Sequence, residues 1–195
     1  MPRMTAAMNT SVEPSSLLPA VAHGDLAAFE QLYDRHSSTL YALLLRILAN
    51  PDDAQEVLQE TFVKAWMNAK MFDSVRGSDV AWLISIARSR GIDRLRSRRI
   101  RGDREDEAGR EVSSSFGFVE KRTGADDAIQ SEERRAVRSA LAELPDSQRI
   151  ALALAYFEGL SQSEIAEKLG EPLGTIKTRM QLGMKKLRES LKAFR

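Results

Sequence analysis

The chain has 195 residues, of which 43% are hydrophobic and 29% charged, and its formal net charge is +1. This length and composition permit a buried core in one or two domains. Abundant helix-forming residues with only 6% aromatics disfavour a β-sandwich, and the absence of cysteine excludes a thiolate as metal ligand or nucleophile.

Residues 1–22 are predicted to form a disordered leader. The segment mixes Thr, Asn, Ser and Pro without a continuous apolar stretch, so it does not resemble a secretory signal. Met4 and Met8 leave the true start codon open. The longest apolar run, residues 150–157, is far shorter than the roughly 20 residues that a membrane-spanning helix needs. We therefore expect a soluble protein, and the lack of cysteine fits the cytoplasm.

Three helices are predicted in the first half of the chain. Apolar residues recur at steps of three and four from Asp25 to Ile47, as a buried helical stripe requires. A second helix follows "ANPDD", where Asp52 is a candidate N-cap, and its stripe extends to Trp66. A third helix over residues 79–100 contains Gly91, which costs about 1 kcal/mol relative to alanine and weakens the prediction of an unbroken helix.

Residues 102–130 lose this periodicity and gain Gly, Ser and mixed charge, which predicts a linker. Helical patterning resumes near Ser131, stops at Pro145 and then continues toward the C-terminus. We therefore predict an all-α fold of two small helical domains, residues 23–101 and 131–195, joined by a flexible linker.

Charge is distributed less evenly than the net value suggests. Residues 85–104 contain eight arginines and two aspartates, and the stretch from Pro172 to the end contains seven Lys or Arg and one Glu. The compensating acid lies in the linker and in residues 51–60, which have four carboxylates and no base. The chain therefore has two basic surfaces and one acidic surface.

The C-terminal basic stretch follows a helix-turn-helix pattern. Ser161 and Glu164 form a capping box, so a helix begins at Ser161. Gly170 supplies the left-handed position that ends this helix, and Pro172 suits the first turn of the next one. If the motif binds DNA in the usual way, the early part of the second helix reaches base edges in the major groove.

The candidate base-contacting residues are Thr175, Lys177, Thr178, Arg179 and Gln181. Lys and Arg pair with guanine or phosphate, Thr contacts phosphate or a thymine methyl, and Gln bridges adenine. Leu173, Ile176 and Met180 have the alternate spacing and are expected to pack on the first helix. An ordinary helical hairpin with a solvated polar face is the alternative interpretation of this stretch alone.

Four segments together resemble an extracytoplasmic-function (ECF) sigma factor of bacterial RNA polymerase. They are "FEQLYDRH", "DDAQEVLQETFVKAW", "RGSDVAWLISIARSRGIDRLRSRR" and "LPDSQRIALALAYFEGLSQSEIAEKLGEPLGTIKTRMQLGMKKLRE", in this order around a variable linker. The resemblance covers about residues 24–101 and 131–190. It implies that residues 23–101 are sigma region 2 and residues 131–195 sigma region 4.

The resemblance assigns region 2 to core polymerase and to the minus-10 promoter element. Binding to the clamp helices of the largest polymerase subunit is implied for Asp53, Glu56, Gln59 and Glu60. A solvated acidic face is the alternative interpretation of these residues. The following loop, "AKMFDSVRGSD", is implied to receive a base flipped from the non-template strand, with contacts from Lys70, Phe72 and Arg76. Phe72 also fits a core position.

The arginine-rich helix is implied to lie along the melting minus-10 DNA, where phosphate neutralisation supplies affinity. The residues chosen are Arg88, Arg90, Arg94, Arg98 and Arg99. Many family members have Asn where Ser89 stands, which leaves the minus-10 sequence open. Trp82 is assigned to the core, since large aromatics at helical spacing usually pack there, and His36 is assigned a structural role.

The minus-35 element is implied to be read as duplex by region 4. "PLGTIKTR" resembles the family form, which adds Pro172 and Gly174 to the candidates, and Gln181 and Leu182 stand where members vary. The implied partners are promoter DNA, core RNA polymerase through the clamp helices and the beta-subunit flap, and an anti-sigma factor, often membrane-anchored. No cofactor, metal, small-molecule substrate or catalytic residue is implied.

Other function classes explain less of the sequence. A stand-alone helix-turn-helix regulator accounts for the C-terminal domain and leaves the acidic and arginine-rich helices without a role. An enzyme is disfavoured because the chain has two histidines, no cysteine and no clustered metal ligands. An adaptor that binds protein through the acidic helix leaves both basic surfaces unexplained.

Overall fold

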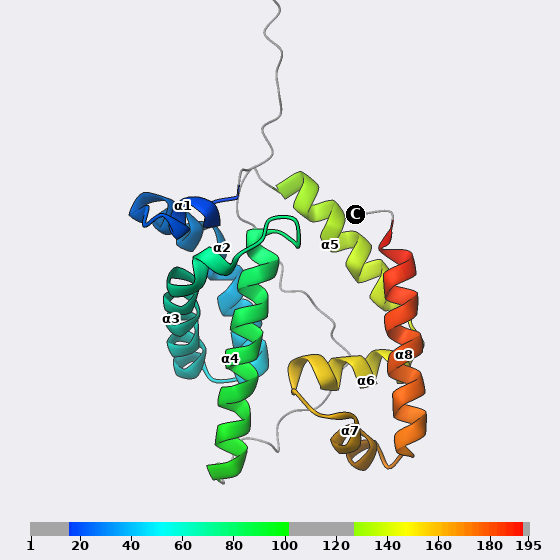
Figure 1. Cartoon of the computed structure of the whole chain (residues 1–195). Helices are drawn as coiled ribbons and strands as arrows, with labels where there is room; N and C mark the ends of the chain where they lie inside the picture. The colour runs from blue at the N-terminus through cyan, green and yellow to red at the C-terminus, as the bar shows by residue number, and fades with distance from the viewer. Residues whose placement is uncertain (1–15, 102–126, 193–195) are drawn as a thin grey trace, which may run out of the picture. The chain divides into compact units, whose positions relative to one another are not determined.

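The computed structural model describes residues 16–101 and 127–192, and these form helices joined by short connections (Figure 1). The elements before the gap are α1 (Leu18–Ala22), α2 (Leu26–Leu48), α3 (Pro51–Asn68), the short 3₁₀ helix η1 (Ala69–Met71) and α4 (Asp79–Arg101). The elements after it are α5 (Asp127–Ala142), α6 (Asp146–Phe157), α7 (Gln162–Leu169) and α8 (Leu173–Ser190). No strand occurs in these two ranges, so the prediction of an all-α fold is confirmed.

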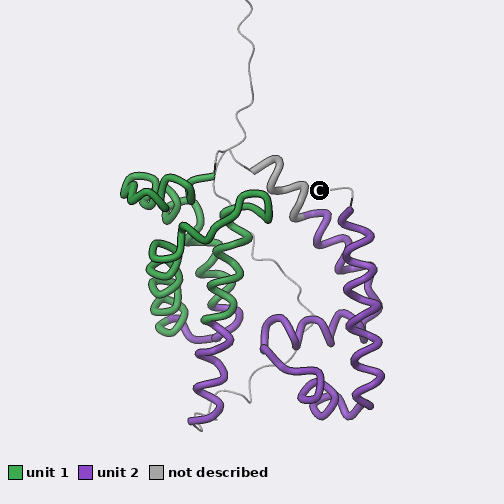
Figure 2. The backbone as a smooth tube through the Cα atoms, viewed as in Figure 1, with its two compact units in different colours: residues 1–44, 52–90 green, residues 45–51, 91–195 purple. Residues whose placement is uncertain are grey.

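The chain divides into two compact units, which Figure 2 shows in different colours. The first unit comprises residues 1–44 and 52–90, and the second comprises residues 45–51 and 91–195. The division passes through α2 and α4, so each of these helices contributes residues to both units. Residues 102–126, most of the predicted linker, lie outside the described residues.

The core of the first unit is built by the apolar stripes of α2, α3 and α4. Its buried residues include Leu32, Leu40, Leu44, Ala54, Val57, Leu58, Phe62, Ala65, Leu83 and Ala87. Phe29 packs edge to face on Trp66, with ring centroids 5.1 Å apart. Each large side chain buried here contributes about 1.5–3 kcal/mol relative to an exposed one, so this packing holds the polar faces of the helices outward.

The prediction of a disordered leader over residues 1–22 is wrong for its last part. Leu18–Ala22 form helix α1, and Leu18 and Val21 are 0% and 2% exposed in the core of the first unit. The helix begins beside Pro19, which costs nothing in a first turn because its missing N–H has no partner there. Residues 1–15 lie outside the described residues.

Other local predictions about these helices also need correction. Asp52 does not cap α3, because the helix already begins at Pro51 and Asp52 lies in its first turn. Leu26 and Tyr33, assigned to the buried stripe of α2, are 67% and 37% exposed. Gly91 was expected to weaken the third helix, but α4 continues without a break through this buried glycine from Asp79 to Arg101.

The second unit has its core among α6, α7 and α8. Ala151, Leu154, Ile165 and Ile176 are buried together, and Leu160, Leu169 and Met180 pack around them. α5 also contacts α8, and it begins at Asp127, earlier than the Ser131 expected from the sequence. Pro145 is the N-cap of α6, consistent with the predicted break at this proline.

Within the described ranges, no helix is long and apolar enough to cross a membrane.

Candidate nucleic-acid interface

The turn between α7 and α8 has the geometry that the sequence predicts. The backbone N–H of Ser161 donates to Glu164 Oε2 at 2.7 Å, and the N–H of Glu164 donates to Ser161 Oγ at 3.3 Å. Hydrogen bonds to the Glu164 carboxyl, first from the Ser161 side chain and then from the Ser161 backbone, lower the pKa of this carboxyl. Gly170 ends α7 at φ 64°, and its N–H donates back to the carbonyls of Ala166 and Glu167. The capping box and the glycine stop fix both ends of the short helix α7.

The inner face of α8 determines which of its side chains point outward. Ile176 is fully buried beside Ile165, and Met180 is partly buried against the same cluster. Leu173 was also expected to pack inward, but it lies in the first turn and is 38% exposed. Gly183 is buried, and a Cβ at this position would lie 2.9 Å from Leu152 Cδ1. A side chain at position 183 would therefore require Leu152 of α6 to shift, and glycine lets α8 approach α6 closely without that shift.

The predicted DNA-contacting residues of α8 are mostly on its outer face. Pro172, Gly174, Lys177, Thr178, Gln181 and Leu182 are exposed, and Thr175 and Arg179 are half-buried. Arg179 forms an ion pair with Glu171, with Nη2 and Oε1 3.1 Å apart. Thr178 Oγ1 donates to the Gly174 carbonyl at 2.9 Å, which leaves its lone pairs available as acceptors.

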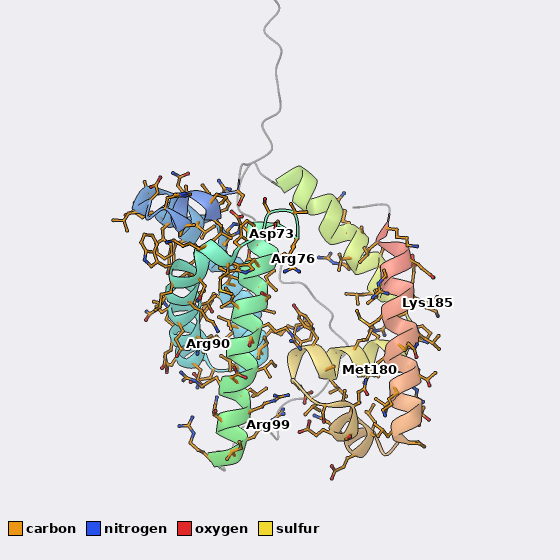
Figure 3. All side chains as sticks on the ribbon, viewed as in Figure 1. Asp73, Arg76, Arg90, Arg99, Met180 and Lys185 are labelled. Atoms are coloured by element: carbon orange, nitrogen blue, oxygen red, sulfur yellow. The ribbon has the colours of Figure 1, made fainter. Side chains whose placement is uncertain are left out.

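Lys185 was missed by the sequence analysis. It is exposed and projects from α8 (Figure 3). Lys177, Gln181 and Lys185 follow one another at intervals of four residues, so they share one face of the helix. The same periodicity that located the core could have identified this residue.

The loop between η1 and α4 carries a second group of predicted residues. Lys70 is exposed, and the Arg76 side chain is 86% exposed, with Nε 3.9 Å from Asp73 Oδ2 (Figure 3). The half-buried Phe72 ring packs edge to face on Trp82, with centroids 5.8 Å apart. Trp82 is also only half-buried, so these two rings form a partly exposed pair rather than the fully buried core expected for Trp82.

The predicted arginines of α4 lie along this helix, as the labels of Arg90 and Arg99 in Figure 3 illustrate. Arg88, Arg90, Arg94, Arg98 and Arg99 are all half-buried. Within the second unit, Arg99 Nη1 donates to the carbonyl of Glu158 at 3.2 Å. Half-burial of this kind is typical of arginines whose aliphatic stems lie along protein surface.

The acidic face of α3 contacts an arginine of α4, which the sequence did not predict. Glu56 and Gln59 are exposed, whereas Asp53 and Glu60 are half-buried. Glu60 Oε2 lies 3.7 Å from Arg90 Nη1, so α4 supplies a base to this carboxylate. This contact compensates part of the Glu60 charge within the first unit, and the polymerase-binding role of Glu60 stays a prediction.

In the described part of the chain, no group of three or more His, Cys, Asp or Glu side chains could hold a metal ion.

His36 is 7% exposed, and burial, followed by the charge of Arg35, lowers its pKa. A buried neutral imidazole of this kind fits the structural role expected for it.

Two family models match the chain. "Sigma-70 region 2" matches residues 32–100, which include the acidic face of α3, the loop after η1 and most of α4. "Sigma-70, region 4" matches residues 134–187, which include α6, α7 and most of α8.

Full-length relatives match both regions together. The "ECF RNA polymerase sigma factor SigK" of Mycobacterium tuberculosis (strain H37Rv) is 38% identical over 189 residues, covering 96% of this chain and 98% of the relative. SigK of Mycolicibacterium vanbaalenii is 36% identical over 182 residues, covering 93% and 90%.

Among solved structures, Rhodobacter sphaeroides SigE in complex with the anti-sigma ChrR is 31% identical, with coverage of 89% and 94% and a TM-score of 0.43. The sigma factor RpoE of Bartonella quintana in complex with the anti-sigma factor NepR is 26% identical, with coverage of 87% and 100% and a TM-score of 0.38.

Proposed function

Since this chain belongs to the ECF RNA polymerase sigma factors, we propose that it directs the polymerase to promoters by contacting two DNA elements through separate helical surfaces. Residues 23–101 are proposed as the part that binds core polymerase and the minus-10 element. Residues 131–195 are proposed as the part that binds the minus-35 element. Family membership supports this division, and the separation of the basic residues into two groups fits it.

The outer face of α8 is proposed to read the minus-35 duplex. Lys177, Gln181 and Lys185 form an exposed polar stripe on that face, and the exposed Met184 lies beside it. Arg179 is held by Glu171, which fixes the direction of its guanidinium group before DNA arrives. Such preorganisation reduces the side-chain entropy lost on binding and favours a defined base or phosphate contact.

The loop after η1 and the arginines of α4 are proposed to hold the opened minus-10 strand. Arg76 is exposed in the loop, and the partly exposed rings of Phe72 and Trp82 offer apolar surface on which a base can stack. The half-buried arginines of α4 supply positive charge along the helix that follows this loop, where each phosphate contact releases a condensed counterion.

The exposed acidic residues of α3 are proposed to bind the clamp helices of the largest polymerase subunit. Glu56 is the clearest candidate, because it is exposed whereas Glu60 is half-buried. A contact between region 4 and the beta-subunit flap, and control by an anti-sigma factor, are proposed from family membership alone. The protein is proposed to perform no chemistry itself, to need no cofactor and to act in the cytoplasm with the polymerase.

The observation that carries the proposal is the presence, in one chain that matches both sigma regions, of a capped helix-turn-helix and an exposed acidic helix face. A stand-alone helix-turn-helix regulator needs the first feature only. The two functions differ in whether specific DNA binding depends on polymerase.

Fluorescence anisotropy of labelled upstream DNA from the source genome separates these functions. We expect sequence-specific binding with core polymerase present, and only salt-sensitive, sequence-independent binding without it. Specific binding of equal affinity without core polymerase is the result expected of the stand-alone regulator and would contradict the proposal.

A further inference from the structure

Asp79 is a buried carboxylate whose hydrogen-bond partners come from the N-terminal end of the chain. It is 6% exposed and is the first residue of α4. Its Oδ1 accepts a hydrogen bond from Ser16 Oγ, and its Oδ2 accepts one from the backbone N–H of Leu17 at 2.7 Å. A buried carboxylate is costly unless it is hydrogen-bonded, so this contact ties Ser16 and Leu17 firmly to the start of α4.

The residues that follow Leu17 contact the other side of the same loop. α1 packs against η1, and Leu18 and Val21 of α1 are almost completely buried. Ala69, the first residue of η1, is also buried, at 3% exposure. The segment Ser16–Ala22, called the N-terminal clasp below, therefore contacts η1 at one end of the loop and Asp79 at the other.

The loop between these two anchors, residues 72–78, is exposed along most of its length. Val75 is 92% exposed. Hydrogen bonds at its tip are local: the N–H of Val75 donates to Asp73 Oδ1 at 3.0 Å, and the N–H of Arg76 donates to the Asp73 carbonyl at 3.0 Å. These bonds shape the turn itself and do not fix its direction relative to the helices. The direction is set where the loop joins η1 and α4.

We propose that the N-terminal clasp positions the loop 72–78 and thereby sets how strictly one base of the minus-10 element is chosen. This inference rests on the proposed function of the loop in capturing a base. Ser16 and Asp79 are positioning residues in this account, since they touch neither DNA nor polymerase. Ser16 and Asp79 act on base choice indirectly, because they hold the two ends of the loop 72–78 in place.

The physical argument concerns preorganisation. A loop held at both ends presents its base-binding surface in one arrangement. The loop cannot adjust to a wrong base, so that base binds with a much less favourable free energy. A loop released at one end samples several arrangements, and it accepts a wrong base with less penalty. The clasp should therefore affect discrimination between bases more than the total amount of transcript.

Transcription from a promoter library tests whether the N-terminal clasp sets base discrimination. The minus-10 and minus-35 elements of a mapped promoter are randomised in separate pools. Holoenzyme is assembled with the full-length protein carrying Ser16→Ala, Ser16→Thr or Asp79→Asn, and transcripts are counted by sequencing. Ser38→Ala is the matched control, because Ser38 is exposed on α2. Circular dichroism melting checks that each variant is folded, and Ser16→Ala decides the question if Asp79→Asn does not fold.

We expect Ser16→Ala to reduce the base preference at one or two minus-10 positions by about three- to tenfold, which is less than the full effect of losing one hydrogen bond to a charged group because only part of that loss reaches the loop. Ser16→Thr, which keeps a hydroxyl, should restore the preference, and all minus-35 preferences should stay unchanged. A lower yield with unchanged preferences would overturn the proposal, since it indicates only a structural role. If the wild-type protein shows no preference at any minus-10 position, the proposed function of the loop itself fails.

Discussion

The imidazole of His36 is buried in the first compact unit, and its environment makes a prediction at the scale of a single residue. Burial and the positive charge of Arg35 lower its pKa, and the negative charge of Asp79 opposes them. The folded protein therefore keeps His36 neutral at a pH at which the unfolded chain, with its ordinary value of 6.5, already binds a proton.

Because the unfolded state binds more protons below pH 6.5, the free energy of unfolding should fall as the pH drops from that value toward the lowered pKa of the folded state. Above pH 6.5 this residue adds no pH dependence. Urea unfolding of the wild type and of His36→Gln at pH 7.5 and 5.5 measures the effect. The variant should lose less stability on acidification than the wild type. Equal losses would contradict a buried neutral imidazole.

At the same scale, single residues mark the limit of what the sequence can predict. Glu60 and Arg90 were assigned to different partners, because nothing in a linear sequence says that α3 and α4 bring them within 3.7 Å. Leu26 has the spacing of a core residue, yet it lies in the first turn of α2 and is exposed. Periodicity identifies a face of a helix, but it does not say how far the packing partner extends along that face.

At the scale of the element, helix α7 depends on its two ends. Eight residues form too short a helix to be stable alone in water, so capping and packing must hold it. Its N-terminus has both hydrogen bonds of a capping box, and Ile165 anchors it in the core.

Replacing Ser161 with Ala should lower the free energy of unfolding by about 1 kcal/mol, the usual cost of losing an N-cap. The same change should weaken minus-35 binding, because α7 supports the start of α8. Chemical denaturation of the protein, and binding of a minus-35 duplex by the holoenzyme assembled with core polymerase, measure the two effects. Ser163→Ala is the matched control, since Ser163 is exposed in the first turn and is not the cap. Equal stability of the Ser161 variant and the wild type would count against the role of the cap.

The long elements were predictable because each has a sustained apolar stripe and recognisable end residues. Capping at Ser161 and the left-handed Gly170 are local interactions, so the sequence alone identified them. The sequence did not predict α1, because this helix has neither a sustained apolar stripe nor recognisable end residues. Five residues are too few to show a period, and the preceding Ser and Pro residues are typical of a leader. Only its tertiary contacts, through Leu18 and Val21, reveal it as part of the fold.

For the whole molecule, the acidic face of α3 gives the prediction that concerns assembly with polymerase. Glu56 is exposed, so its charge can be reversed without opening the core. Glu60 is less suitable, because a lysine there would stand beside Arg90 and repel it. The structure therefore favours Glu56 as the position at which to reverse a charge.

Glu56→Lys should weaken co-purification with core polymerase at least about tenfold, as expected when a repulsive charge enters a complementary interface. Its melting temperature should match that of the wild type. Glu30→Lys is the matched control, because Glu30 is exposed on α2 and lies outside the proposed interface. Unchanged recovery of the Glu56 variant with core enzyme would remove α3 from the polymerase interface.

The division of the chain into two basic surfaces also belongs to this scale. Promoter elements that are far apart on DNA cannot be covered by one small domain, and tethering two domains raises the effective concentration of the second at its site. The total charge of +1 gives no indication of this arrangement, whereas the local charge along the chain does. The base sequence of either promoter element depends on individual contacts with DNA, and neither charge nor periodicity contains it.

Run-off transcription with purified core RNA polymerase is the most direct test of the central claim, that this chain confers promoter specificity on the polymerase. The templates are fragments of the source genome, including the region upstream of this gene. We predict discrete transcripts that appear only when the protein is added and that start at a fixed distance from two short sequence elements. Absence of such transcripts from every template, together with absence of binding to core polymerase, would contradict the account.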